Sequence, residues 1–90
     1  MPKRLTARQI RVLSILAEEG RLAERAIRER VAKKERMAIH RVAVSSTLRS
    51  LHRRHYVQIG SAGGWVATYN GRDALRAHDA IRRAREELGS

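Results

Sequence analysis

One part of this chain changes its hydrophobic period from helical to strand-like, and that change limits the folds that the chain can adopt. Within residues 42–54, Val44, Leu48 and Leu51 recur at a spacing that places them on one face of a helix. Directly afterwards, in residues 57–67, apolar residues alternate on both sides of a Ser-Ala-Gly-Gly turn signal. The sequence therefore predicts a helix over 42–54 that leads straight into a β-hairpin.

The opposite face of this predicted helix is polar and basic. Ser46, Arg49 and Arg53 fall on it, together with Val42. His55 follows where a C-cap is expected, and histidine tolerates the left-handed conformation better than most residues. The apolar face suits packing on a core, and the basic face suits contact with a polyanion.

A helix is also predicted near the start of the chain, over residues 5–20. Thr6 and Gln9 form a capping box at its beginning, and Gly20 supplies a left-handed stop at its end. The residues on its expected core face are Ile10, Leu13, Leu16 and Ala17.

The remaining segments complete the order of elements. Residues 21–23 suit a short extended segment, and a second helix begins near residue 24. Residues 33–36 are polar on all sides and either prolong that helix or form a connection. Thr68 is placed to cap a last helix.

Length and composition indicate one domain with an aliphatic core. The chain has 90 residues and no cysteine, so neither a disulfide nor a thiolate metal site can stabilise it. It has one tryptophan, two tyrosines and no phenylalanine, so Leu, Ile, Val and Ala must fill the core. We expect residues 1–68 to form the main body and residues 69–90 to form a C-terminal helix of the same domain.

The charge of the chain points to a polyanionic partner. Twenty Lys and Arg oppose nine Asp and Glu, which gives a formal net charge of +11. Composition alone leaves DNA, RNA, an anionic membrane and an arginine-rich genome as explanations. The chain has no apolar run that spans a bilayer and no signal peptide, so we expect no membrane insertion and a cytoplasmic location. That location would be the nucleoid in a bacterium or archaeon, or the host cell interior for a viral protein.

Three segments resemble winged helix-turn-helix repressors. They are LTARQIRVLSILAEEGRL for the first helix, VSSTLRSLHRRHYV for the recognition helix, and WVATYNGRDAL for the exit from the wing. The match runs in register over residues 5–75 and is most similar to the MarR and PadR families. The long connection between residues 27 and 44 is similar to the penicillinase-repressor family instead. The resemblance implies a mainly α fold of three helices, a small hairpin wing and a C-terminal helix.

In such proteins the third helix reads the major groove of double-stranded DNA, the hairpin contacts the minor groove or backbone, and terminal helices form a homodimer. The recognition residues would be Arg41, Val42, Ser45, Ser46, Arg49, Arg53 and Arg54. The wing and N-terminal contacts would be Lys3, Arg4, Arg8, Ser61, Gly63 and Gly64. The dimerisation stripe would be Ala74, Leu75, His78, Ile81 and Leu88. Arg49 is long enough to reach a guanine edge, whereas Arg53 and Arg54 are better placed for phosphates.

Three departures from the family pattern affect this expectation. The connection between the second and third helices is longer than in a compact MarR domain. His55 replaces the usual glycine after the recognition helix. The tip of the hairpin, residues 61–64, carries no arginine or lysine, so the usual minor-groove arginine is missing. The glycines of the tip can still let backbone amides approach a phosphate.

No pattern indicates an enzyme. The chain shows no catalytic constellation, cofactor motif, metal spacing or evident small-molecule site, and His52 and His55 have no further ligand near them in sequence. The leading hypothesis is a small dimeric transcriptional regulator that binds specific DNA sequences. The alternatives are a sequence-independent, architectural nucleic-acid binder, a winged-helix protein-interaction module and an RNA-binding winged helix.

Overall fold

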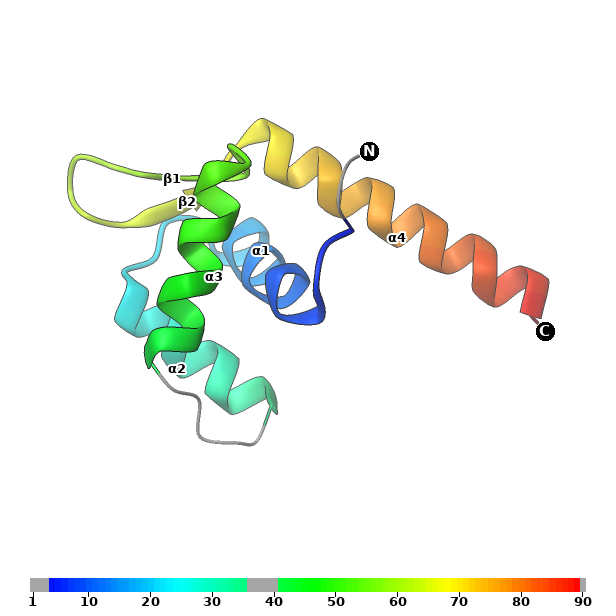
Figure 1. The fold of residues 1–90 in the computed structure, drawn as a ribbon, viewed down its shortest axis with the longest axis horizontal. Helices are drawn as coiled ribbons and strands as arrows, with labels where there is room; N and C mark the ends of the chain where they lie inside the picture. Colours follow the sequence, from blue (N-terminus) through cyan, green and yellow to red (C-terminus); the bar gives the residue numbers. More distant parts are fainter. Residues whose placement is uncertain (1–3, 36–40, 90) are drawn as a thin grey trace.

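A computed structural model describes residues 4–35 and 41–89, and it confirms the predicted order of three helices, a hairpin and a final helix (Figure 1). The elements are α1 (Ala7–Glu19), α2 (Glu24–Glu35), α3 (Arg41–Arg53), β1 (Val57–Ile59), β2 (Trp65–Ala67) and α4 (Tyr69–Gly89). Residues 33–35 prolong α2, and α3 begins and ends one residue earlier than predicted.

Helix α1 lies at the centre of the fold, in contact with α2, α3, α4 and β2. Because it has neighbours on several sides, it buries more than one stripe of side chains. Val12 and Ile15 are fully buried, whereas Ile10 and Ala17, predicted for the core, are only half-buried. The buried apolar residues are Val12, Leu13, Ile15, Leu16, Ile27, Val31, Val44, Leu48, Leu51, Val57 and Ala67. All are aliphatic, as the composition predicts, and each large one stabilises the fold by about 1.5–3 kcal/mol.

The ends of α1 follow local sequence signals, with one difference. At the start, the Gln9 N–H donates to Thr6 Oγ1 at 3.1 Å, and the Thr6 N–H donates to Gln9 Oε1 at 2.8 Å. The capping box is therefore confirmed. At the end, Gly20 has the expected positive φ of 81°, but its ψ of −139° lies outside the left-handed helical region. The chain leaves α1 in this way because it continues directly into an extended segment.

That extended segment forms a bridge to the hairpin. Strands β1 and β2 pair antiparallel, with Val57 opposite Ala67 and Ile59 opposite Trp65. On the other side of β2, the Leu22 N–H donates to the Trp65 carbonyl at 3.0 Å and the Trp65 N–H donates to the Leu22 carbonyl at 2.7 Å. The connection between α1 and α2 is thereby fixed against the wing.

Helix α3 ends in a left-handed turn at His55, whose φ is +63°. The Tyr56 N–H donates to the Leu51 carbonyl and the His55 N–H donates to the His52 carbonyl, each at 3.0 Å. This pair of bonds is the Schellman arrangement. The prediction that His55 adopts the left-handed conformation is confirmed.

The exit from α3 is also bonded to the start of α4. Thr68 caps α4 by accepting from the Gly71 N–H at 3.1 Å, and its hydroxyl donates to the His55 carbonyl at 2.6 Å. The Thr68 N–H donates to the Tyr56 carbonyl at 3.0 Å. Gly71 is buried, and a side chain there would overlap the Tyr56 carbonyl oxygen.

Helix α4 packs through its first half against the part of the domain that the structure describes. Ala74, Leu75 and His78 are half-buried, and Leu75 contacts the core. Every residue from 80 to 89 is exposed, and this end of α4 projects away from the side of the molecule that carries the hairpin (Figure 1).

Candidate nucleic-acid interface

The outer face of α3 is open to solvent and carries three of the seven predicted recognition residues, Ser46, Arg49 and Arg53. The inner face of α3 is formed by Val44, Leu48 and Leu51, which are 0% exposed. The opposite face of the helix therefore points toward solvent. The exposed side chains on the opposite face are those of Ser46, Arg49, His52 and Arg53. Ser45 lies at the edge and is half-buried. The backbone of Arg41 and Val42 belongs to α3, but their side chains lie outside the part that the structure describes.

A part-buried polar contact joins α1 to α3. The Gln9 side chain is 8% exposed, and its Nε2 donates to Ser50 Oγ at 2.9 Å. Its Oε1 accepts a hydrogen bond from the Thr6 N–H at the start of α1. The Gln9 side chain therefore forms hydrogen bonds to residues of both helices. A hydrogen bond between two helices has a directional preference that apolar packing lacks, so it favours one rotation of α3 about its axis. The sequence indicates only the capping half of this role.

The two arginines at the end of α3 differ in their surroundings. Arg53 is exposed, whereas Arg54 is half-buried. The Arg54 guanidinium carbon lies 4.8 Å from the centre of the Tyr56 ring, and Arg54 Nη2 lies 3.5 Å from Tyr56 Oη. Arg54 therefore reaches solvent from a stacked position, and Arg53 extends freely from the outer face.

The wing adjoins this face through an aromatic contact. The His52 ring meets the Trp65 ring edge-on, with 6.0 Å between the ring centres. Trp65 is half-buried against the core. At the tip, Ser61 and Gly63 are exposed, but Gly64 is buried beneath the side chain of Arg21. A phosphate approaching Gly64 would meet Arg21 first, and sequence reasoning missed this arginine.

The other predicted basic contacts lie at the N-terminus. Lys3 falls outside the described residues, Arg4 is exposed and Arg8 is half-buried. A sequence signal that marks the interface more clearly is the distribution of acids. No Asp or Glu occurs among residues 36–72, which contain six arginines. This acid-free stretch includes α3 and the whole hairpin.

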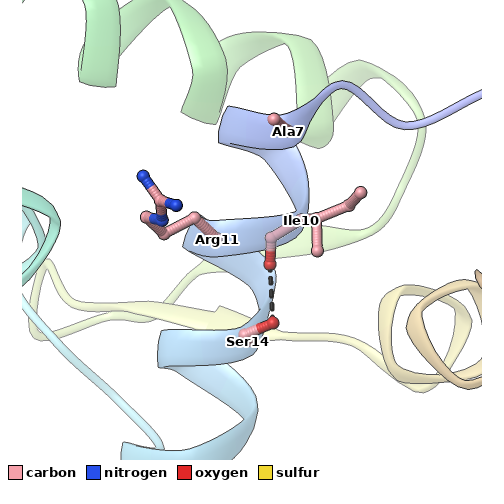
Figure 2. Close-up of a pocket in the computed structure, with 4 residues that line it drawn as sticks. All are labelled: Ala7, Ile10, Arg11 and Ser14. Carbon is pink, nitrogen blue, oxygen red and sulfur yellow. Dashed lines mark hydrogen bonds between the residues drawn. The ribbon is translucent and has the colours of Figure 1, made fainter. Parts of the chain in front are cut away.

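A shallow hollow of about 570 Å³ lies on the outer side of α1 (Figure 2). Ala7, Ile10, Arg11 and Ser14 line it, and the Ser14 hydroxyl donates to the Ile10 carbonyl at 2.7 Å. These residues form one stripe of α1, on the side away from the core. Because the hollow is shallow and has few polar groups, it suits packing against another surface better than enclosing a ligand.

Two further findings concern other kinds of site. Within residues 4–35 and 41–89 no group of three or more His, Cys, Asp or Glu side chains is arranged to hold a metal ion. None of the described helices combines the length and apolarity needed to cross a lipid bilayer.

Comparison with solved structures supports the fold. The chain is similar to the complex structures of hsRosR-S1 and hsRosR-S4, with TM-scores of 0.78 and 0.79 and 21% sequence identity in both cases. The matches cover 92% of this chain and 75% and 73% of the RosR chains. RosR is a haloarchaeal winged-helix transcriptional regulator, and the likeness shows that this chain has the winged-helix fold. No protein-family model matches the chain, and no curated protein matches it in sequence.

Proposed function

We propose that this protein is a small transcriptional regulator that binds specific sequences of double-stranded DNA, with α3 in the major groove. The observation that carries the proposal is the division of α3 into a fully buried aliphatic face and an exposed face with Ser46, Arg49 and Arg53. The major groove is about 12 Å wide and admits one α-helix. Short side chains near the start of the exposed face let the helix approach the bases closely.

The charge distribution supports DNA as the partner. The arginines of α3 lie within residues 36–72, a stretch of the sequence that contains no carboxylate to oppose their charge. The resemblance of the motifs to MarR-like and PadR-like regulators and the structural likeness to RosR point to the same class. A protein-interaction module would not require such an excess of arginine on one face.

We propose further that the protein acts as a homodimer through α4. Ile81 and Leu88 are 56% and 88% exposed and lie two helical turns apart on the same face. All residues from 80 to 89 of α4 are exposed, and a short helix that is not packed against a core is only marginally stable in water. A second copy would cover this stripe. Leu75 is already packed on its own core, so the dimer contact centres on residues 81–88.

Selection of bound duplexes from a random pool tests the proposed function. We expect enrichment of a palindrome, because a two-fold symmetric dimer presents two equivalent recognition helices. Binding without enrichment would favour the sequence-independent architectural protein. Failure to bind any duplex would contradict both functions.

Binding to DNA is expected to depend steeply on salt. Each neutralised phosphate contributes about 0.9 to the slope of log K against log salt concentration. A dimer that presents Arg53, Arg54 and the N-terminal arginines twice is expected to contact roughly six or more phosphates, so the slope should be about 5 or more in magnitude. Fluorescence-anisotropy titrations at several potassium chloride concentrations measure it. A slope smaller than about 3 in magnitude would mean that few of the basic residues contact DNA phosphates.

Replacement of both Ile81 and Leu88 by lysine is expected to convert the dimer to a monomer. The substitutions remove the apolar contact and place like charges opposite each other across the two-fold axis. Light scattering after gel filtration, at tens of micromolar protein, reports the mass. The control is Arg83→Ala, on the other side of α4, which should leave a dimer. A wild-type monomer, or a double variant of unchanged mass, would refute the dimer.

A further inference from the structure

An arginine from outside the hairpin lies across the wing. Arg21 follows α1 and precedes Leu22, whose two backbone hydrogen bonds to Trp65 hold this segment beside β2. The side chain of Arg21 covers Gly60 and Gly64, the residues at the two ends of the turn. A Cβ placed on Gly64 would lie 2.5 Å from Arg21 Cγ and 2.9 Å from Cδ. A Cβ placed on Gly60 would lie 3.1 Å from the guanidinium carbon.

The two glycines therefore form a track for the arginine side chain. The aliphatic part of Arg21 lies on Gly64, and its guanidinium reaches Gly60 at the other end of the turn. Gly64 is buried by this contact, whereas Arg21 itself is exposed. Any residue other than glycine at position 64 would displace the stem. The track explains why glycine stands at position 64, whose φ is not positive.

The guanidinium of Arg21 is available to a ligand. Within the described part of the chain, no carboxylate forms an ion pair with it. Residues 57–67 of the wing carry no charged side chain. Arg21 therefore supplies the positive charge at this part of the surface. A planar guanidinium with its stem already ordered loses less side-chain entropy on binding a phosphate than a freely rotating one does.

We infer that Arg21, held across Gly60 and Gly64, is the cation through which the wing contacts the phosphates of duplex DNA. The hairpin lacks a basic residue of its own, and the connection between α1 and α2 supplies one. This inference rests on the proposed function. It adds to that function a phosphate contact made by a residue outside the hairpin sequence.

The test compares Arg21→Ala with Arg83→Ala on one duplex, using the full chain. Both substitutions remove one exposed positive charge, but Arg83 belongs to the exposed second half of α4, far along the chain from the wing. Arg21→Ala is expected to weaken binding about tenfold at physiological salt and to reduce the salt slope by about 1 per chain. Arg83→Ala is expected to change binding less than twofold. Thermal melting should show both variants folded, because both side chains are exposed.

A second variant tests the glycine track. Gly64→Ala leaves the charge unchanged and should weaken DNA binding by displacing Arg21. The double variant Arg21→Ala/Gly64→Ala should bind no more weakly than Arg21→Ala, because only one contact is lost. Additive losses would overturn the inference, since they would mean that Gly64 acts without Arg21.

The outcomes separate this inference from the function on which it rests. If the wild type binds duplex DNA and Arg21→Ala behaves like Arg83→Ala, the inference is wrong and the proposed function stands. If the wild type binds no duplex at all, both are wrong. A selective loss in Arg21→Ala, reproduced by Gly64→Ala, supports both.

Discussion

Replacement of Gly71 by alanine is expected to lower the free energy of unfolding by about 1–3 kcal/mol. In most helices this change is stabilising, by up to about 1 kcal/mol, because alanine has the higher helix propensity. Here the added methyl group would overlap the carbonyl oxygen of Tyr56, which accepts a hydrogen bond from Thr68. The methyl group is fixed to the backbone of α4 and would meet backbone atoms of Tyr56, so rotating a side chain cannot relieve the overlap. The steric cost is therefore expected to exceed the gain in helix propensity.

Thermal unfolding followed by circular dichroism measures this effect. For a domain of this size the loss corresponds to a fall in Tm of roughly 5–20 °C. Gly89→Ala is the matched control, because it lies in the same helix and no atom stands within 4 Å of an added Cβ. An unchanged or raised Tm for Gly71→Ala would show that α4 can shift away from the exit of α3.

Arg49→Ala is expected to reduce affinity for the selected site by roughly 5- to 150-fold, which corresponds to about 1–3 kcal/mol. Its side chain is exposed one turn beyond Ser46 on the outer face of α3, where a guanidinium can fork onto a guanine edge. A contact with a base is lost only on the correct sequence. Affinity for random duplex should therefore fall much less.

The control for Arg49 is Arg53, which is exposed one turn further along the helix. Arg53→Ala should weaken binding to selected and scrambled duplexes about equally and should flatten the salt slope by about 1 per chain. Arg54→Ala should behave in the same way, with an added loss of stability from its contact with Tyr56. If Arg49→Ala weakens both duplexes by the same factor, then Arg49 contacts a phosphate, and Ser45, Ser46 and Arg41 become the candidates for base recognition.

The features that sequence predicted are those that depend on neighbours along the chain. The capping box of Thr6 and Gln9, the left-handed turn at His55 and the cap at Thr68 each involve residues a few positions apart. The faces of α3 follow from helical periodicity in the same way. Gly20 shows the limit, because its ψ depends on the extended pairing that follows it.

The features that sequence missed depend on contacts between distant segments. Gln9 bonds to Ser50, 41 positions away, and the covering of Gly60 by Arg21 requires the bridge between Leu22 and Trp65. Contacts between segments this far apart in the sequence leave no periodic pattern from which they could be predicted. Burial along α1 was incompletely predicted for a similar reason, since a helix with four neighbours has no single core face.

Trp65 has a practical consequence for the study of this protein. It is the sole tryptophan, and it touches three elements at once: the His52 ring of α3, the Leu22 bridge and strand β1. Indole emission depends on the polarity of its surroundings, and this indole is half-buried. Its intrinsic fluorescence is therefore a label-free probe confined to the seam between the wing and α3. A spectral change on mixing with a ligand would locate the event at that seam, while events at the far end of α4 would leave the emission unchanged.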